Sequence, residues 1–299
     1  MNRKLQGYIK DPGRIILWLM EKGLFDKWPD DKYLRLRYRL KMKKKLNLEN
    51  PLRFSEKLQW LKLNNRKPEY SAMVDKYAAK QYAAKKIGEG YIVKTLGVWD
   101  CFDDIDFDTL PDQFVLKCTQ DSGGLVICPD KKKLDKEEAN RKLSGSLRVN
   151  YYLRGREWPY KDVVPKIIAE EYLENDASKG LYDYKVWCFN GRAEYVQFIS
   201  GRLGNDVYEG FYNRDWVLQD FSYHNKKMHE PIPKPDKLEE LLYLSEQLSK
   251  DIPFARIDFY ILPDNSIRFG EITFYPMGGM ERFHPNEMDD SLGKMISLE

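Results

Sequence analysis

Two segments near the C-terminus predict a β-hairpin, and this hairpin constrains the fold more than any other feature of the chain. Residues 254–261 alternate apolar and polar side chains over most of their length, residues 263–266 (Pro-Asp-Asn-Ser) have turn composition, and residues 267–272 form a return strand. A hairpin with both strands this apolar has to pack at least one face on a core, so we expect it within a larger sheet.

The polar residues of this hairpin predict a site for metal and phosphate. Arg256, Asp258 and Tyr260 share one face because side chains alternate along a strand, and Glu271 and Thr273 can reach the same side. Two carboxylates and a hydroxyl beside an arginine suit Mg²⁺ with a phosphate chain. An ordinary exposed hairpin with a surface ion pair has the same pattern, so other segments must decide between these readings.

Composition narrows the class of protein. The 299 residues are 42% hydrophobic and 32% charged, which is typical of a globular protein. Fifty basic residues nearly balance 47 acidic ones, and a net charge of +3 argues against a dedicated nucleic-acid binder. The sequence has no long apolar run and no signal-peptide pattern, so we expect a cytoplasmic protein. The four cysteines lack a Cys-x-x-Cys spacing and are expected to be reduced, mostly buried thiols.

The first 70 residues have a helical pattern rich in lysine and arginine. Residues 33–45 combine Tyr33, Leu34 and Leu40 with many basic side chains. Such a helix can lie on an anionic membrane surface or face an acidic glycan. The alternative is an amphipathic helix that packs its apolar side on the body of the protein.

The middle of the chain contains two lysines in positions suited to a nucleotide. Asp75 and Lys76 open an alanine-rich helix that Gly88 ends. Residues 113–118 form a strand that delivers Lys117 to a polar loop, and residues 125–128 form the returning strand. The loop contains Ser122, Gly123 and Gly124, whose amides can approach phosphate oxygens. The same loop also fits a plain hairpin turn.

A further strand ends in a linker that can contact a nucleobase. Residues 167–173 run from Ile-Ile-Ala into Glu170, Glu171, Tyr172 and Leu173. Backbone groups that leave a strand are free to pair with the edge of an adenine ring.

The sequence after this linker predicts two more strands and a helix. Residues 182–189 predict a strand with Asp183 and Lys185 on one face, Asn190-Gly191 predicts a tight turn, and residues 194–199 pair back. Residues 236–250 predict an amphipathic helix with a leucine stripe.

Taken in order, these segments resemble the ATP-grasp superfamily, and more narrowly the TupA-like ATP-grasp family of bacterial surface-polysaccharide loci. The narrower resemblance rests on Asn-Pro-Leu-Arg-Phe-Ser-Glu-Lys-Leu-Gln-Trp at residues 50–60, on residues 183–191, and on Glu-Ile-Thr-Phe-Tyr-Pro at residues 271–276. It covers roughly residues 30–285. Two departures stand out: Thr273 replaces the asparagine of many ATP-grasp ligases, and the loop before Gly124 has few glycines.

The resemblance implies roles for individual residues. Nucleotide contacts fall on Lys76, Lys117, Ser122, Gly123, Gly124, Glu170, Glu171, Tyr172 and Leu173. Metal ligands fall on Asp258, Glu271 and Thr273. Catalytic contacts fall on Arg256, Lys185 and Asp183, and substrate contacts on Arg202, Tyr275, Gly278, Gly279 and Arg282.

The same resemblance implies a fold and a reaction. The fold is α+β: a helical N-terminal segment (1–70), a small α/β subdomain (71–112), a lid (113–170) and a C-terminal, antiparallel-rich catalytic unit (171–299). The cofactors are ATP and Mg²⁺. The reaction is the joining of a carboxylate to an amine through an acyl-phosphate, with an amino acid or amine and a uronic-acid carboxylate of a glycan or sugar nucleotide as substrates. Peripheral contact with the inner membrane face is a further expectation, and oligomeric state stays open.

Other functions remain alternatives at this point. Asp104-Ile105-Asp106 and Asp106-Phe107-Asp108 have the Asp-x-Asp pattern of metal-dependent glycosyltransferases. A glycan kinase with the same ATP site, or a non-catalytic glycan-binding protein, also fits. A hydrolase is disfavoured because no Gly-x-Ser-x-Gly segment is present and only three histidines are available as bases.

Overall fold

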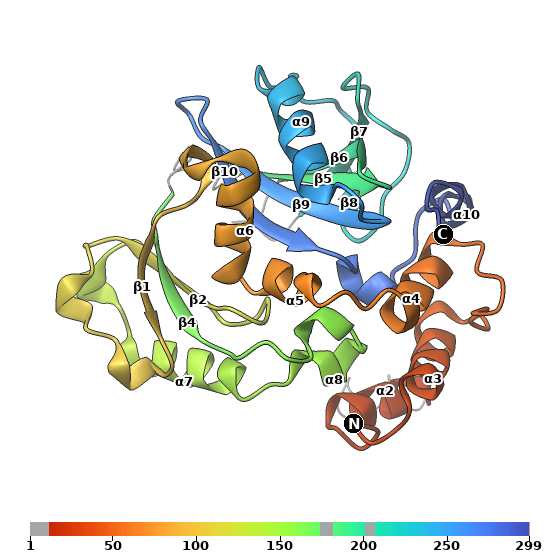
Figure 1. Ribbon diagram of the computed structural model, residues 1–299, viewed down its shortest axis with the longest axis horizontal. Helices are drawn as coiled ribbons and strands as arrows, with labels where there is room; N and C mark the ends of the chain where they lie inside the picture. The colour runs from red at the N-terminus through yellow and green to blue at the C-terminus, as the bar shows by residue number, and fades with distance from the viewer. Residues whose placement is uncertain (1–11, 174–181, 201–206, 299) are drawn as a thin grey trace, which may run out of the picture.

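The computed structural model describes residues 12–173, 182–200 and 207–298, which form two antiparallel-rich sheets joined by helices (Figure 1). The smaller sheet and helix α7 (Lys136–Leu147) make one lobe, and the larger sheet and helix α9 (Leu238–Ser249) make the other. Helix α6 (Ala78–Ile87) lies between the two sheets in this view and contacts both α9 and the larger sheet. This mixed architecture confirms the predicted α+β class.

The smaller sheet has the strand order β1-β4-β2-β3. Its strands are β1 (Thr95–Trp99), β2 (Phe114–Cys118), β3 (Leu125–Cys128) and β4 (Ile167–Glu171). Helix α7 covers one face, where Ala139 and Leu143 pack against Phe114 and Leu116. The sheet therefore combines a strand from the predicted α/β subdomain with strands from the predicted lid, and the division of the chain at residue 112 stays a prediction.

The larger sheet has the strand order β10-β9-β5-β6-β7-β8. Its strands are β5 (Asp183–Phe189), β6 (Arg192–Ser200), β7 (Tyr208–Asn213), β8 (Lys226–Lys227), β9 (Phe254–Ile261) and β10 (Ile267–Thr273). The predicted hairpin is confirmed as β9 and β10, with its turn at residues 262–266. It lies at the edge of the sheet, and β9 pairs with β5 on its other side.

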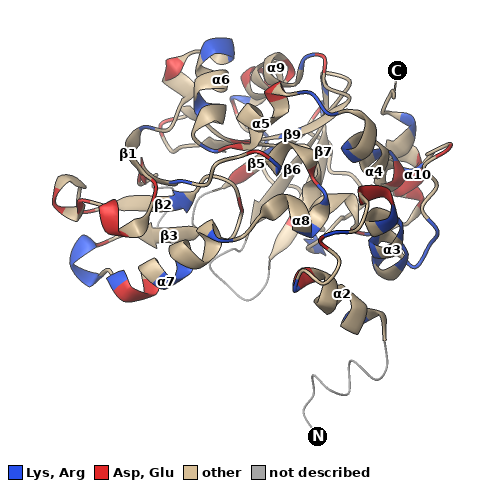
Figure 2. Ribbon diagram, turned by 60° about the horizontal axis from the view of Figure 1, so that its bottom comes forward, with Lys and Arg blue, Asp and Glu red and all other residues tan. Residues whose placement is uncertain are grey.

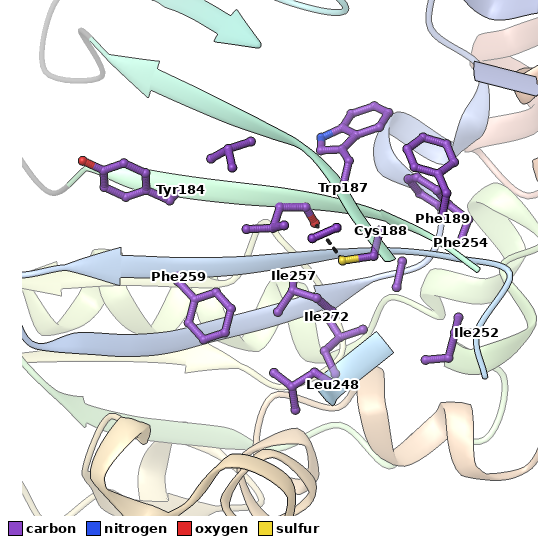
Figure 3. Packing of buried hydrophobic residues seen from close by; sticks show 14 of the residues in the cluster. Tyr184, Trp187, Cys188, Phe189, Leu248, Ile252, Phe254, Ile257, Phe259 and Ile272 are labelled. Carbon is purple, nitrogen blue, oxygen red and sulfur yellow. Dashed lines mark hydrogen bonds between the residues drawn. The ribbon is translucent and has the colours of Figure 1, made fainter. Parts of the chain in front are cut away.

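The strict alternation of side chains gives this sheet two different faces. Tyr184, Val186 and Cys188 of β5 are opposite Phe259, Ile257 and Ala255 of β9. This face packs on α9, and the Cys188 thiol lies 3.9 Å from the Ser245 carbonyl. The other face carries Lys185 and Trp187. Figure 3 shows Trp187 and Phe189 projecting from one side of β5, with Leu248 and Phe259 on the other side.

Further helices, most of them from the N-terminal half of the chain, surround this core. They are α2 (Gly13–Glu21), α3 (Asp30–Met42), α4 (Phe54–Asn64), α5 (Glu69–Val74) and α6, followed later by α8 (Tyr151–Gly155) and α10 (Glu287–Lys294). Helix α3 buries Tyr33, Leu34, Tyr38 and Met42. Its apolar side therefore packs on the body of the protein, as the packing alternative predicts. No helix in the described part of the chain is long and apolar enough to cross a membrane.

The smaller predictions about local structure are also confirmed. Asn190 and Gly191 both have positive φ, at 49° and 79°, as a tight turn of this kind requires. The Asp75 carboxylate accepts hydrogen bonds from the amides of Tyr77 and Ala78 at the start of α6, and Gly88 follows its end with φ of 101°. Three of the four cysteines are buried, and all are free thiols.

Phe54 joins the N-terminal helices to the larger sheet. Its ring stacks on Trp187 with 5.5 Å between centroids and meets Phe254 and Phe283 edge-on at 4.9 and 5.7 Å. Phe54→Ala should lower the free energy of unfolding by about 3–5 kcal/mol, because it removes a fully buried ring from a packed aromatic cluster. Urea denaturation measures this. Leu52→Ala is the matched control, since Leu52 is 61% exposed, and a similar loss in both variants would contradict the packing role of Phe54.

Candidate functional site

Four polar side chains of the hairpin meet on one face of the larger sheet. The Arg256 guanidinium donates to Asp258 Oδ1 at 2.7 Å and Oδ2 at 2.8 Å. It also donates to Glu271 Oε1 at 3.3 Å and to Thr273 Oγ1 at 3.1 Å. The Lys185 ammonium binds the same Asp258 carboxylate from β5. The structure thus brings together the residues that the resemblance marks as metal-binding and catalytic.

A β-bulge at Gly270 decides which side Glu271 faces. Phe269 is opposite Phe259, but the next pair along the ladder is Glu271 with Asp258, so Gly270 is the extra residue. In a regular ladder Gly270 would be opposite Asp258, and Glu271 would lie with Ile257 on the apolar face. A Cβ atom at position 270 would approach the Asp258 carbonyl oxygen to 3.0 Å, which favours glycine there.

The surrounding charges keep Glu271 ionised. Burial raises the pKa of Glu271, but Lys76 and Arg256 outweigh burial and lower it to about 2. The same ion pairing raises the pKa of Arg256, against the effect of its own burial. The Glu271 side chain is still 37% exposed, so a ligand can reach it. At neutral pH this face therefore presents an anionic, accessible Glu271.

Lys76 approaches the same face from the turn between α5 and α6. Its ammonium lies 3.9 Å from Glu271 Oε2 and donates to the Asp121 carbonyl oxygen in the polar loop. The amide of Lys76 donates to the Thr119 carbonyl at 3.0 Å, which fixes the end of α5 against the loop. Within that loop, the Gly124 amide donates to Asp121 Oδ1 at 3.0 Å. A Cβ at Gly124 would lie 2.5 Å from the Cys118 sulfur, whereas position 123 is open apart from Asp121.

Glu170 joins two lysines between the sheet and α6. Its carboxylate lies 2.5 Å from the Lys117 ammonium and 2.6 Å from that of Lys80. Burial raises the pKa of Glu170, but the two lysines outweigh it and lower the pKa overall. Lys80 also donates to the Val93 carbonyl at 2.8 Å. The sequence analysis missed Lys80, which lies in the first turn of α6 and meets Glu170 only through tertiary packing.

The remaining predicted hinge residues lie at the end of β4. The Glu171 carboxylate accepts from the Lys94 amide at 3.1 Å, and the Glu171 amide donates to the Lys94 carbonyl at 3.0 Å. Tyr172 and Leu173 are partly buried and are the last residues described before residue 182. Arg202, which the sequence analysis assigns to substrate, lies outside the described residues.

A cavity of about 430 Å³ opens beside the hairpin face. Its lining includes Lys76, Ser122, Arg256, Glu271 and Thr273. Tyr275 and Gly278 contribute to the wall, as do residues that sequence reasoning missed because they are far apart in the chain. These are Arg37, Lys41, Lys62, Asp121, Tyr151, Arg154, Glu157 and Tyr160.

The other two predicted substrate residues lie elsewhere. Gly279 packs on α4, where an added Cβ would lie 2.7 Å from Gln59 Nε2. Arg282 lines a separate, smaller pocket with Met42 and Lys44, and its guanidinium donates to the Lys41 carbonyl at 3.4 Å.

The hairpin face has the donor set that Mg²⁺ prefers. Asp258, Glu271 and Thr273 supply hard oxygen atoms, and one or two carboxylates completed by substrate phosphates is the usual pattern for this ion. The described residues contain no group of three or more His, Cys, Asp or Glu side chains arranged for a metal. The set therefore fits a metal shared with a nucleotide better than a metal held by the protein alone.

Comparison with known families decides the classification. A family model described as TupA-like ATP-grasp matches residues 56–297. The chain belongs to the TupA-like ATP-grasp family. Membership confirms the family and the ATP-grasp fold that the sequence predicts. Helix α3 lies before the matched residues.

Solved structures of other ligases are similar in part. N5-carboxyaminoimidazole synthetase from Staphylococcus aureus is 17% identical with a TM-score of 0.39, over 68% of this chain and 44% of that one. L-amino acid ligase from Bacillus licheniformis is 14% identical with a TM-score of 0.46, over 75% and 49%. D-alanine–D-alanine ligase from Bacillus anthracis is 18% identical with a TM-score of 0.40, over 68% and 55%. The chain thus spans about half the length of these proteins. No curated protein matches the chain.

Glu170→Gln should lower the free energy of unfolding by about 3 kcal/mol at neutral pH, because it leaves the buried Lys80 and the partly exposed Lys117 without their shared counter-charge. The lowered pKa of Glu170 means that its charge stabilises the fold above the ordinary glutamate range, and that this contribution is lost as the pH falls through the folded-state value. The difference between variant and wild type should therefore shrink in acid. Urea denaturation from pH 7 to pH 3 measures it, with Glu171→Gln as control, and a constant difference would contradict the ion-pair explanation.

Proposed function

We propose that this protein is an ATP- and Mg²⁺-dependent carboxylate–amine ligase that works through an acyl-phosphate. The observation that carries the proposal is the row of Arg256, Asp258, Glu271 and Thr273 on one sheet face, with Lys185 and Lys76 against it at the wall of a cavity. Positioning and charge neutralisation are most of what phosphoryl transfer needs from a protein.

Each side chain in this row has a proposed role. Asp258, Glu271 and Thr273 hold Mg²⁺, which supplies charge neutralisation to the phosphates when it is bound. Lys76 and Lys117 contact the nucleotide phosphates, with the loop amides of residues 122–124 beside them. Glu170 to Leu173 border the adenine, and Asp183 and Lys185 keep Asp258 oriented.

The proposed reaction has two steps. A carboxylate oxygen of the acceptor attacks the γ-phosphorus of ATP, the bond from that phosphorus to the β–γ bridging oxygen breaks, and ADP leaves. The amine nitrogen then attacks the acyl carbon, the carbon–oxygen bond to phosphate breaks, inorganic phosphate leaves and the nitrogen loses a proton. The proposed role of Arg256 is to stabilise the oxyanion of the second step with its fixed positive charge.

The proposed substrates follow from the family and from the charge of the cavity. The acceptor is a uronic-acid carboxylate of a bacterial surface polysaccharide or its sugar-nucleotide precursor, as in capsule synthesis, and the second substrate is an amino acid or another amine. Tyr275 and Gly278 line the cavity where the acceptor would bind. We place this reaction in the cytoplasm, with peripheral contact to the inner membrane face where the acceptor is lipid-linked.

The glycosyltransferase alternative has less support. Asp104, Asp106 and Asp108 are all exposed; Asp104 and Asp108 lie in short 3₁₀ turns, and the Asp106 carboxylate caps the second turn by accepting from the Asp108 amide at 3.0 Å. None of them lines the cavity. A glycan kinase would use the same nucleotide site, so only the product separates it from a ligase.

A thermal-shift titration tests the nucleotide. Mg²⁺-ATP should raise the melting temperature in a concentration-dependent way, because a ligand that binds only the native state stabilises it by RT ln(1 + [L]/Kd). Mg²⁺-UDP-sugars, titrated in parallel, should give a smaller shift. A shift with UDP-sugars alone would favour the glycosyltransferase. Lys117→Ala should weaken the response to ATP, and an unchanged response would remove Lys117 from the nucleotide site.

Trapping with hydroxylamine tests the acyl-phosphate. Wild-type protein with Mg²⁺-ATP, galacturonic acid and hydroxylamine should form a hydroxamate together with ADP, whereas a kinase would form ADP without hydroxamate. Glu271→Gln should reduce the rate by at least about a hundredfold, since it removes one of two carboxylates that face the metal. Glu239→Gln, at an exposed site on α9, is the matched control. A Glu271→Gln rate near that of wild type would mean that the hairpin is not the metal site.

A further inference from the structure

The cavity beside the catalytic hairpin has a second wall that the proposed reaction leaves without a role. Helix α3 contributes Arg37 and Lys41 to this wall, and α8 contributes Arg154. The two helices are in direct contact, because the Tyr33 hydroxyl donates to the Arg154 carbonyl at 3.0 Å. Figure 2 shows the basic positions of α3 in blue. Helix α3 precedes the residues that the family model matches, whereas α8 lies within them.

The cations near the hairpin already have strong partners. Arg256 makes two hydrogen bonds to Asp258, and Lys76 binds the Asp121 carbonyl and approaches Glu271. Lys62, at the floor of the cavity, is fully buried and donates to the Gly155 and Gly278 carbonyls at 3.0 and 2.7 Å. These groups are held by the protein before any ligand binds.

The cations of the second wall have few hydrogen-bond or ion-pair partners among the described residues. Among the described residues, the Arg37 side chain reaches only the Tyr33 hydroxyl at 3.5 Å and Glu21 at 3.9 Å. Within the described chain, the side chains of Lys41 and Arg154 form no ion pair and no hydrogen bond. Burial, and then the neighbouring Arg37, lower the pKa of Lys41. A partly desolvated cation that also faces another cation is unfavourable unless an anion completes the site.

The nearby acids do not neutralise this wall. Glu157 is 6% exposed and lines the same cavity, but its carboxylate forms no ion pair with Arg37, Lys41 or Arg154 in the described chain. Burial raises the pKa of Glu157, although Lys62, Arg37 and Lys41 oppose this effect. Glu281, Glu21 and Glu157 all act to raise the pKa of Lys41, but burial and Arg37 outweigh them. Of these three acids, only Glu157 lines the cavity beside the three cations.

We propose that Arg37, Lys41 and Arg154 form a subsite for a second anionic group of the acceptor, in addition to the carboxylate that reacts. This inference rests on the proposed function for the identity of the reacting carboxylate, and it names the substrate class more closely: a uronic acid that carries a further carboxylate or a phosphate. An arginine guanidinium can donate two parallel hydrogen bonds to the oxygens of a carboxylate or a phosphate, and a lysine ammonium binds the same oxygens. A neighbouring uronate in an oligosaccharide would supply a carboxylate, and a glycosyl phosphate would supply a phosphate.

Calorimetric titration tests the subsite, with the nucleotide site filled by Mg²⁺ and a non-hydrolysable ATP analogue. The probes are galacturonic acid, digalacturonic acid and galacturonic acid 1-phosphate, which carry one carboxylate, two carboxylates, or a carboxylate and a phosphate. Wild-type protein should bind at least one of the two doubly charged probes about tenfold or more tighter than galacturonic acid. The probe with the larger advantage identifies the source of the second anion.

Two double variants of α3 distinguish a specific anion subsite from a general effect of the positive charge of the helix. Arg37→Gln with Lys41→Gln should abolish the advantage of the doubly charged probe while the affinity for the ATP analogue stays unchanged. Lys32→Gln with Arg39→Gln removes two exposed positive charges from the same helix and should keep the advantage. An equal loss in both double variants, or equal binding of all three probes by wild-type protein, overturns the subsite. The absence of hydroxamate in the trapping assay would instead overturn the ligase proposal and leave these binding results standing.

Discussion

The two-bond contact between Arg256 and Asp258 is the interaction on which the site depends. Burying these charges is costly unless they are paired and hydrogen-bonded, and here the carboxylate also receives Lys185 while the guanidinium extends to Glu271 and Thr273. The network exists because β5, β9 and β10 are neighbours in one sheet, in a register that places these residues opposite one another. The opposite face of the sheet is apolar and packs on α9. Burial of its side chains holds the register, because a shift by one residue would expose them to water.

A second ionic group links the two lobes of the protein. Glu170 on β4 of the smaller sheet binds Lys117 on β2 and Lys80 on α6, and the turn just before α6 brings Lys76 to the hairpin face. The small sheet, the connecting helix and the large sheet are thus coupled through charges at the predicted nucleotide site. A polyanionic ligand such as ATP would enter a region where several cations are already in place, which is the electrostatic preorganisation that phosphoryl transfer requires.

The polar patterns of the sequence were sufficient for the hairpin, because alternation along a strand and turn chemistry are local properties, whereas the fold class followed from the family resemblance. They were also sufficient to single out Lys76, Lys117, Asp258 and Glu271, each of which stands at an element boundary or on a strand face. They could not reveal Lys80 as a partner of Glu170, since the two are 90 positions apart and meet only through packing. Nor could they separate Gly278, at the cavity, from Gly279, which packs against α4.

The sequence by itself determined the hairpin of β9 and β10, the strands β2 to β6, the amphipathic character of α3 and α9, and the family to which the order of motifs is similar. Tertiary structure alone decided the face of Glu271, because a bulge at Gly270 shifts the pairing by one residue and turns the carboxylate towards Asp258. It also decided that Arg37 and Lys41 line the cavity, since only the packing of α3 on the body brings them beside Arg154 and the hairpin. Local periodicity fixes the faces of an isolated element, whereas register and helix docking depend on long-range contacts that a short stretch of sequence does not contain.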